Sequence, residues 1–326
     1  MSKEIHDLVM IGAGPAALSA AIYTTREDID TVLYEKAVIG GLAAVTDLID
    51  NYPGFFEGVT GLDLSEDLRK HAERFGADIR VGDVTSLFDE GKYKHLVTTD
   101  GDIYAKTVLI ATGTAYKMLG CSGETDYYAR GVHYCATCDG AFYRDKRLVV
   151  VGSGNSAVQE SMFLTRFASH IDMLIRGDHL KASEVLIKDL KKHDKITVHL
   201  NTTTDEIIGE NNQVTAVIGT DKLTGKKVTY PTDGVFVFVG LTPNTSFLQG
   251  SSVELNEYGF IETNEKLETN LMGVFAAGDV RASATMQIAS AVGEGATAAL
   301  KIREYLEDHK KKYPISERPE KSKVSV

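Results

Sequence analysis

The feature that most constrains this chain is a glycine-rich turn between a short apolar strand and a helix. The run Gly12-Ala13-Gly14-Pro15-Ala16-Ala17 follows the apolar stretch 6–11 and opens a helical stretch of small residues that ends near Thr25. Gly12 permits the tight turn, Gly14 lets the main chain approach a pyrophosphate, and Ala17 lets the helix pack closely on the strand. The turn therefore predicts a strand–helix unit that binds a dinucleotide.

A second strand completes this unit and ends in an acid. Residues 31–34 are apolar, and Glu35 follows them directly. A carboxylate at this place accepts hydrogen bonds from the ribose of an adenosine, whereas NADP would favour a basic residue. The unit over residues 6–36 therefore predicts a site for FAD or NAD.

The same pattern returns at residue 147, so the chain contains two nucleotide-type units. The strand 147–151 leads into Gly152-Ser153-Gly154-Asn155-Ser156-Ala157, a helix over 158–165 and a strand over 170–175. Basic groups after that strand would suit a 2′-phosphate, and the alternative is a Rossmann-like domain that binds no nucleotide. The residues of this candidate NADPH site are Gly152, Gly154, Asn155, Ser156, Arg176 and Lys181.

Other loops of small residues follow predicted strands. Ligands of parallel sheets bind at the carboxyl ends of the strands, although ordinary connections would explain such loops equally well. Residues 273–279 are a short buried strand that ends in a glycine and Asp279, near the start of a helix over 287–305, and this acid could bind the polyol part of a flavin nucleotide. The other loops are 40–43, 50–55 and 111–114.

The remaining pattern predicts a mixed α/β chain. Residues 62–75 have the spacing of an amphipathic helix, and residues 79–99 alternate as antiparallel strands do. Residues 104–110 form an apolar strand, and a hairpin is predicted around Leu223-Thr224-Gly225 before another strand over 234–240.

Cys135 and Cys138 are the one close pair among the three cysteines of the sequence, and Asp139 follows them. A zinc site would need four ligands, for which Cys121 and His133 are the nearest candidates. An inert structural disulfide is a second alternative, although it is unusual in a cytosolic protein. A redox-active pair is the interpretation that we prefer.

Composition excludes several classes of function. The formal net charge of −11 argues against nucleic-acid binding, which requires a basic face. No apolar stretch approaches the length of a membrane span, and the charged residues 1–7 do not resemble an export signal. We therefore expect a cytoplasmic protein that binds neither nucleic acid nor membrane.

Together these residues resemble the low-molecular-weight thioredoxin reductases, which are flavoproteins with two dinucleotide domains. The resemblance covers residues 6–306 and depends most on the run Cys135-Ala136-Thr137-Cys138-Asp139-Gly140, placed just ahead of the second unit's first strand. It rests further on Gly12 to Ala17, Asn51-Tyr52-Pro53-Gly54-Phe55, Gly154-Asn155-Ser156-Ala157 and Ala277-Gly278-Asp279-Val280.

The resemblance implies an α/β fold in which a second Rossmann-like domain is inserted into the first. The FAD domain would comprise residues 1–115 and 246–308, the inserted domain 116–245, and a C-terminal tail 309–326. Contacts with FAD would come from Gly12, Gly14, Pro15, Ala16, Glu35, Gly41, Leu42, Asn51, Thr112, Gly113, Gly278, Asp279, Gln287 and Ile288.

The resemblance also implies a mechanism and partners. Reduced flavin would pass electrons to the disulfide, with Cys138 facing the flavin and Cys135 attacking the disulfide of thioredoxin. Asp139 would hold or supply a proton as thiolates form and leave. Enzymes of this type are homodimers, which are thought to rotate the inserted domain between flavin and partner.

Departures from the family pattern concern the electron donor. Members that use NADPH usually show His-Arg-Arg and then Arg-Ala, whereas this chain has Ile175-Arg176-Gly177 and then Lys181-Ala182. Met286 also stands where an arginine commonly precedes the glutamine. We therefore expect a divergent branch with a degraded NADPH site, which takes electrons from ferredoxin or a similar carrier. The alternatives are a conventional NADPH-dependent thioredoxin reductase and an FAD-dependent dithiol oxidase.

The segment after His309 is rich in lysine, proline and serine and is predicted to be mobile. A further hypothesis is that Tyr313 stacks over a flavin face and blocks the approach of a nicotinamide.

Overall fold

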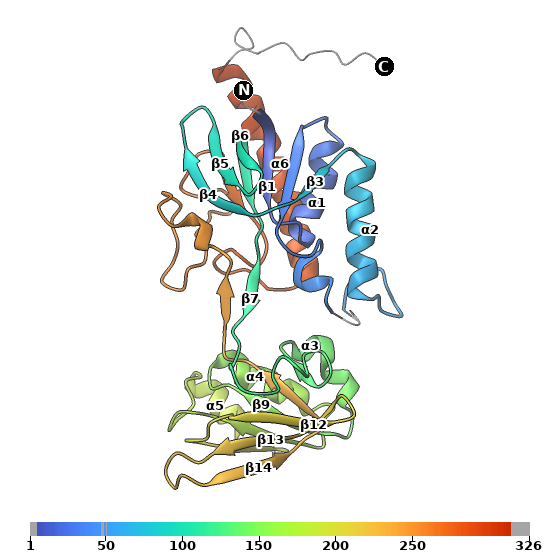
Figure 1. Ribbon diagram of the computed structural model, residues 1–326, viewed down its shortest axis with the longest axis vertical. Helices are drawn as coiled ribbons and strands as arrows, with labels where there is room; N and C mark the ends of the chain where they lie inside the picture. Colours follow the sequence, from blue (N-terminus) through green and yellow to red (C-terminus); the bar gives the residue numbers. More distant parts are fainter. Residues whose placement is uncertain (1–4, 47–48, 50, 314–326) are drawn as a thin grey trace. The chain divides into compact units, whose positions relative to one another are not determined.

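The structure is a computed structural model that describes residues 5–46, 49 and 51–313. The chain divides into two compact units (Figure 1). The first comprises residues 1–46, 60–115 and 242–326, and the second comprises residues 47–59 and 116–241. The predicted α/β fold, with one Rossmann-like domain inserted into another, is confirmed, whereas the exact boundaries at 115, 245 and 308 stay predictions. No helix within the described residues is long and apolar enough to cross a membrane.

The first unit is built on a sheet in the order β3-β2-β1-β6-β5-β4, with β17 beside β6. The strands β1, β2, β3, β6 and β17 run parallel, and β4 and β5 form an antiparallel edge. Their bounds are Ile5–Ile11 (β1), Thr31–Glu35 (β2), Asp78–Val81 (β3), Val84–Asp89 (β4), Lys94–Thr98 (β5), Gly101–Ile110 (β6) and Val274–Ala276 (β17).

The prediction that residues 79–99 are all antiparallel was wrong for β3. This strand pairs parallel with β2, with Asp78 opposite Val32. The alternation of side chains reports which residues face the core, but it carries no information about the neighbouring strand or its direction.

Three helices belong to this unit: α1 (Pro15–Thr25), α2 (Gly61–Arg74) and α6 (Ile288–Lys312) (Figure 1). Helix α1 is buried almost all round because it consists of small residues. A Cβ on Gly295 of α6 would lie 2.1 Å from the carbonyl oxygen of Ala16, so the two helices pack main chain against main chain. This contact fixes the starts of both helices, where the candidate cofactor residues lie.

Helix α2 has a sequence-encoded start. The side chain of Thr60 accepts a hydrogen bond from the main-chain N–H of Asp63 (3.0 Å) and caps the helix. The predicted helix over 62–75 is therefore confirmed to within a residue at each end.

The C-terminal end of α6 differs from the prediction. The helix continues to Lys312, and His309 is buried, with its Nε2 2.9 Å from the carbonyl oxygen of Lys92. The expectation of a mobile segment was therefore wrong for residues 309–313, because a buried histidine anchors the last turns of the helix. Residues 314–326 of the predicted tail lie outside the described residues.

The second unit contains the parallel sheet β11-β10-β9-β15-β8. Alternate residues of β9 separate two cores: Leu148 and Val150 pack with α4 and α5, whereas Val149 and Val151 pack with β12–β14. The bounds are Val132–His133 (β8), Arg147–Val151 (β9), His170–Leu174 (β10), Ile196–His199 (β11), Gly234–Val237 (β15), Asn155–Leu164 (α4) and Glu184–Leu190 (α5).

An antiparallel sheet of three strands covers one face of this parallel sheet. It consists of β12 (Glu206–Glu210), β13 (Gln213–Thr220) and β14 (Lys227–Pro231), and the predicted hairpin at 223–225 joins β13 to β14. The two segments that connect the units, β7 (Thr114–Tyr116) and β16 (Leu241–Pro243), pair with each other. The sequence analysis did not predict this pairing.

Candidate functional site

The glycine turn of the first unit has the geometry that its sequence predicts. Gly12 has a positive φ of 98°, and a Cβ there would lie 2.5 Å from the carbonyl oxygen of Ala111. Gly14 has open space where a Cβ would stand and precedes Pro15, the first residue of α1. Within the part of the chain that the structure describes, no N-cap side chain bonds to the first turn of α1, which leaves its N–H groups available to an anion.

Glu35 holds this turn from the end of β2. Its carboxylate accepts hydrogen bonds from the main-chain N–H groups of Ala13 (2.8 Å) and Ala37 (2.9 Å). A carboxylate has about four acceptor positions, so two remain for the hydroxyls of a ribose. Glu35 therefore fixes the turn and keeps the capacity that the sequence analysis assigned to it.

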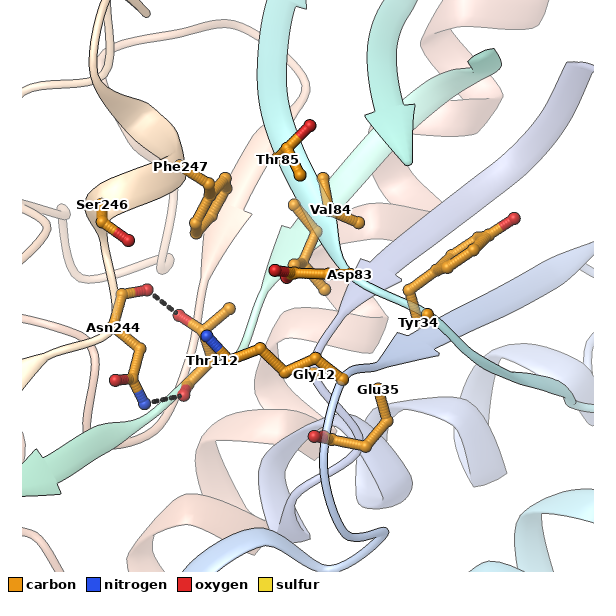
Figure 2. A pocket seen from close by; sticks show the side chains of 13 residues that line it. Gly12, Tyr34, Glu35, Asp83, Val84, Thr85, Thr112, Asn244, Ser246 and Phe247 are labelled. Atoms are coloured by element: carbon orange, nitrogen blue, oxygen red, sulfur yellow. Dashed lines mark hydrogen bonds between the residues drawn. The ribbon is translucent and has the colours of Figure 1, made fainter. Parts of the chain in front are cut away.

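A cavity of about 230 Å³ opens beside the turn (Figure 2). Gly12, Glu35 and Thr112 contribute to its wall, as predicted from the loops that follow β1, β2 and β6. The sequence analysis missed the remaining wall, which lies after β3 and in the returning segment. These missed residues are Ile11, Tyr34, Lys36, Gly82, Asp83, Val84, Thr85, Asn244, Ser246 and Phe247.

Asn244 is the missed residue with the clearest role in the cavity wall. Its side-chain amide donates to the carbonyl oxygen of Thr112 (2.8 Å), and the Thr112 hydroxyl donates to the carbonyl oxygen of Asn244 (2.8 Å) (Figure 2). Gly113 beside them has a positive φ of 62° and accepts a hydrogen bond from the Asn244 N–H. The Pro243-Asn244 step after a strand was visible in the sequence, but its partner across 132 residues was not.

The loop that contains Gly40 and Gly41 lies against the glycine turn. The N–H of Gly40 donates to the carbonyl oxygen of Ala13 (2.8 Å), and a Cβ on Gly41 would lie 3.8 Å from Cα of Gly14. Leu42 is half-buried in the short 3₁₀ helix η1 (Gly41–Ala43) that follows. The structure therefore brings Gly41 and Leu42 to the start of α1, where Pro15 and Ala16 stand.

At the other end of the candidate site, Gly278 and Asp279 follow β17. Glu294 of α6 accepts hydrogen bonds from the N–H of Gly278 (2.7 Å) and from the guanidinium of Arg281 (2.6 Å and 3.1 Å). These bonds tie the loop to α6, whose N-terminal residues are Gln287 and Ile288. The predicted contacts Gly278, Asp279, Gln287 and Ile288 thus belong to one cluster of loop and helix start.

Asp279 is the residue of this cluster whose pKa is raised. Burial, followed by the nearby carboxylate of Glu294, raises the pKa of Asp279 to about 6. Its carboxylate makes no hydrogen bond or ion pair with any residue that the structure describes. Asp279 is partly buried, and a carboxylate in such a place is stabilised when a ligand supplies hydrogen-bond donors.

These features fit FAD as a ligand of the first unit. The open helix start suits a pyrophosphate, the remaining acceptor capacity of Glu35 suits a ribose, and the unpartnered carboxylate of Asp279 suits the hydroxyls of a polyol. Asn51 belongs to the segment 47–59, which clusters with the second unit, so its contact with FAD stays a prediction. Asp50, in the same predicted loop, lies outside the described residues.

Tyr313 lies beside the last turns of α6. Its ring lies 4.8 Å from that of His309 and under the ammonium of Lys92 (5.3 Å). This is the C-terminal end of a 25-residue helix, about 37 Å from the end that carries Gln287. These contacts place Tyr313 at the end of α6 opposite Gln287, and the hypothesis that it stacks over a flavin face stays a prediction.

In the second unit Cys135 and Cys138 form a disulfide, with their Cα atoms 5.4 Å apart. Cys135 caps the short helix α3 (Ala136–Asp139), and its Sγ accepts a hydrogen bond from the N–H of Cys138 (3.2 Å). The bonded sulfurs are not ligands of zinc. Burial, followed by the Glu124 carboxylate, raises the pKa of the third cysteine, Cys121, to about 11, which makes it unreactive as a thiolate.

Asp139 ends α3 and pairs with a histidine that precedes the cysteines. Its Oδ2 lies 3.3 Å from Nδ1 of His133, and Nε2 of His133 lies 2.7 Å from the hydroxyl of Tyr143. The side chains of Asp139 and His133 are 16% and 10% exposed, so both are largely withdrawn from water. The sequence analysis considered His133 only as a metal ligand and missed this contact.

Some residues of the candidate NADPH site leave room for a ligand, and others are already used in contacts within the protein. Gly154 leaves open space before α4, but the side-chain oxygen of Asn155 already accepts a hydrogen bond from the N–H of Ser183 (2.8 Å). Arg176 and Lys181 are exposed, and neither side chain bonds to a residue that the structure describes. Ile175, where the family pattern has histidine, is 1% exposed and packs in the core.

Comparisons with known proteins agree with this geometry. The family model described as pyridine nucleotide-disulphide oxidoreductase matches residues 6–295. A thioredoxin reductase of Bacillus subtilis is 41% identical over 309 residues, which cover 94% of this chain and 97% of the relative.

Two solved structures extend the comparison. The thioredoxin reductase of Streptococcus pyogenes has a TM-score of 0.87 and 37% identity, over 94% of this chain and 100% of that one. The thioredoxin reductase of Giardia duodenalis also has a TM-score of 0.87, at 31% identity and over the same shares of the two chains. The chain therefore belongs to the pyridine nucleotide-disulphide oxidoreductase family and, within it, to the low-molecular-weight thioredoxin reductases.

Proposed function

We propose that this protein is an FAD-dependent thioredoxin-disulfide reductase whose electron donor is not NADPH but ferredoxin or a similar carrier. The observation that carries the reductase activity is the Cys135–Cys138 disulfide on α3, followed directly by Asp139. We further propose that the enzyme is a cytoplasmic homodimer, as the family resemblance implies. Its acceptor is the disulfide of a thioredoxin.

In this proposal the first unit binds and orients the cofactor. Gly12, Gly14, Pro15 and Ala16 face the pyrophosphate, Glu35 holds the adenosine ribose, and Asp279 accepts from the polyol. The remaining residues of the binding site in the first unit are Thr112, Gly113, Gly41, Leu42, Gly278, Gln287 and Ile288, and the contact of Asn51 with FAD stays a prediction. When bound, FAD supplies two-electron reduction to the protein disulfide.

The cysteines carry the exchange with thioredoxin. The thiolate of Cys135 attacks one sulfur of the partner disulfide, which breaks that bond and joins the two proteins. Cys138 then attacks Cys135, restores the protein disulfide and releases reduced thioredoxin. Asp139 supplies a proton to a leaving thiolate and receives one when Cys138 becomes a thiolate.

The proposal about the donor is supported by the side chains after β10. A 2′-phosphate is best held by bidentate guanidinium groups, and this chain offers one arginine, Arg176, with Lys181 as a point charge. Ile175 is buried and apolar, and Gly177 has no side chain. Each lost charged contact costs about 1.5–3 kcal/mol, so two losses weaken binding by about a hundredfold or more if they add.

Reduction of the bound flavin under anaerobic conditions tests the donor. Excess reduced ferredoxin should bleach the visible flavin band and then reduce thioredoxin, whereas excess NADPH or NADH should do so far more slowly. A Cys135→Ser variant should still bleach but should not reduce thioredoxin. Rapid bleaching by NADPH would refute the donor proposal, and peroxide production from small dithiols without thioredoxin turnover would favour a dithiol oxidase.

A gain of function provides the complementary test. A Cβ on Gly177 would meet nothing closer than 3.6 Å, so a side chain fits there. The double variant Gly177→Arg/Lys181→Arg should therefore bind NADPH at least tenfold more tightly than the natural chain. The matched control Lys191→Arg changes an exposed lysine away from this site and should leave the affinity unchanged.

A further inference from the structure

Three side chains next to the redox disulfide in the chain form a row joined by one ion-pair contact and one hydrogen bond. Asp139 ends α3, His133 ends β8, and Tyr143 ends the 3₁₀ helix η2 (Gly140–Tyr143). His133 lies between the other two, with Nδ1 3.3 Å from Oδ2 of Asp139 and Nε2 2.7 Å from the Tyr143 hydroxyl. Its two ring nitrogens therefore join a carboxylate to a phenol.

Packing holds the imidazole of His133 in this orientation. The ring stacks on Phe236 of β15 at 5.2 Å and meets the edge of Tyr143 at 5.3 Å. Gly234 makes room for Tyr143, because a Cβ there would lie 2.5 Å from the phenol ring. The row is therefore fixed by the sheet and by an aromatic cluster, and not by surface side chains that could rotate freely.

The direction of the hydrogen bonds follows from Tyr143. Burial, then the carboxylates of Asp139 and Asp233, raises the pKa of Tyr143 well above its usual value, so its hydroxyl keeps its proton. That hydroxyl can donate to Nε2 of His133, which leaves the ring proton on Nδ1, facing Asp139. A charged His133 would present the same N–H to the carboxylate.

The other titratable groups around Asp139 do not replace His133. Burial, then the charge of Asp139, also raises the pKa of Tyr128, so this phenol stays neutral. Asp233 is negative and pairs with Lys146 at 3.3 Å. Among the described residues, His133 is the group in direct contact with the Asp139 carboxylate that can carry positive charge.

We propose that His133 is a positioning residue which, held by Tyr143, shares one proton with Asp139 and thereby sets the proton supply of the redox cysteines. This inference rests on the proposed function and deepens it. When Cys135 attacks the partner disulfide, the leaving thiolate takes a proton from Asp139, and the His133 N–H stabilises the carboxylate that remains. When Cys138 loses its proton before attacking Cys135, that proton returns to the Asp139–His133 pair. Asp139 first holds the proton that Cys135 gives up as it becomes a thiolate, and the proton received later from Cys138 passes to the second thioredoxin thiolate, which leaves when the Cys135–Cys138 bond forms. Two electrons and two protons thus pass from the enzyme dithiol to thioredoxin, and no further reactant is needed.

The decisive test is the reactivity of the cysteines without thioredoxin and without an electron donor. The FAD-loaded enzyme is reduced with dithiothreitol, freed of reductant anaerobically, and alkylated with iodoacetamide between pH 5 and 9. Peptide mapping then gives the rate at each cysteine. Loss of His133 leaves the Asp139 carboxylate unbalanced beside the thiols, and a carboxylate disfavours a thiolate. His133→Gln should therefore slow alkylation at pH 7 by about three- to tenfold and move its pH midpoint upward.

Three further variants test whether His133 acts on the cysteines through Asp139. In an Asp139→Asn background, His133→Gln should have no further effect, because His133 acts through Asp139. Tyr143→Phe should move the midpoint in the same direction by less, since it removes only the hydroxyl that orients the ring. His193→Gln, a change at a histidine elsewhere in the second unit, should leave the alkylation profile unaltered.

Two results of the alkylation experiment would overturn the proposal. One is a His133→Gln variant with the natural pH midpoint, and the other is an equal shift in the Asp139→Asn background. If His133→Gln does not fold, Tyr143→Phe and the imidazole ¹⁵N signals of the natural protein decide instead. These signals should differ between the disulfide and dithiol forms for His133, and identical signals would also refute the proposal. The alkylation experiment needs no thioredoxin. The proposal about His133 can therefore fail while the proposed function stands, and the proposed function can fail while the proposal about His133 stands.

Discussion

Asp279 allows the cofactor proposal to be tested by pH alone. Its pKa in the protein is about 6 rather than the usual 3.8, because the carboxylate is buried near Glu294. If FAD donates its polyol hydroxyls to this carboxylate, binding stabilises the charged form and returns the pKa toward its usual value. FAD affinity should then be constant above about pH 7 and should fall as the pH drops below 6.

The size of this effect follows from the difference between the two pKa values. They lie about 2 pH units apart, and each unit corresponds to about 1.4 kcal/mol of differential interaction. The affinity should therefore fall by up to about a hundredfold, or about 3 kcal/mol, as the pH passes from 7 to 4. The sign is fixed because the free site holds the proton more tightly than the occupied site, so acid favours release of FAD.

The measurement is an FAD titration of the cofactor-free protein, followed by flavin fluorescence between pH 5 and 8, where the fall should already be visible. Asp279→Asn should remove the pH dependence and should weaken binding at pH 7 by about 1.5–3 kcal/mol, because a charged acceptor is lost. Asp67→Asn, at an exposed position of α2, is the matched control. An unchanged slope in Asp279→Asn, or a flat affinity in the natural protein, would refute the assignment of Asp279 to the polyol.

Two further predictions concern stability, each with its own control. Gly295→Ala should lower the free energy of unfolding by about 2–3 kcal/mol, since its Cβ would lie 2.1 Å from the Ala16 carbonyl oxygen. Urea denaturation measures this loss. The control Gly293→Ala, which has open space around its Cβ, should be neutral or stabilising. Glu124→Gln should lower the free energy of unfolding by about 1–3 kcal/mol. The buried Glu124 carboxylate accepts hydrogen bonds from the N–H groups of Leu119 and Gly120 and from the Tyr134 hydroxyl, whereas the nitrogen of a glutamine amide cannot accept one. Thermal unfolding of Glu124→Gln against the exposed control Glu210→Gln checks the second prediction; equal stabilities would contradict it.

The first dinucleotide unit was predictable because its constraints are local. Gly12 needs a positive φ within one turn, and Glu35 ends the strand that follows the same helix. Both features are encoded within thirty residues, so spacing alone identifies them. The wall formed by Asn244 and Phe247 was not predictable in this way, because a chain must cross the whole inserted unit before these residues return to the loop at Thr112.

The same distinction applies to the strands and to α6. Alternation located β4 and β5, but the parallel pairing of β3 with β2 depends on the twist of the chain after α2 and not on its own residues. The end of α6 was placed too early because lysines 310–312 read as a solvated tail. In the structure the buried ring of His309 holds the preceding turn, and the lysines occupy the exposed, C-terminal turn where positive charge suits the helix dipole.

At the redox site, the sequence motif predicts the reactive side chains but not the residues that contact them. The Cys135-Ala-Thr-Cys138 run predicts two sulfurs near each other, and the acid beside it predicts a proton carrier. Neither says which side chain contacts that acid. The partner, His133, stands two residues before the motif, but it meets Asp139 only because β8 joins the parallel sheet beside β15 and turns the ring against Phe236. The contact that the proposal uses therefore depends on a strand pairing with no counterpart in the motif itself, and a chain with the same Cys-x-x-Cys-Asp run but another residue at 133 should show a different rate of cysteine alkylation at pH 7.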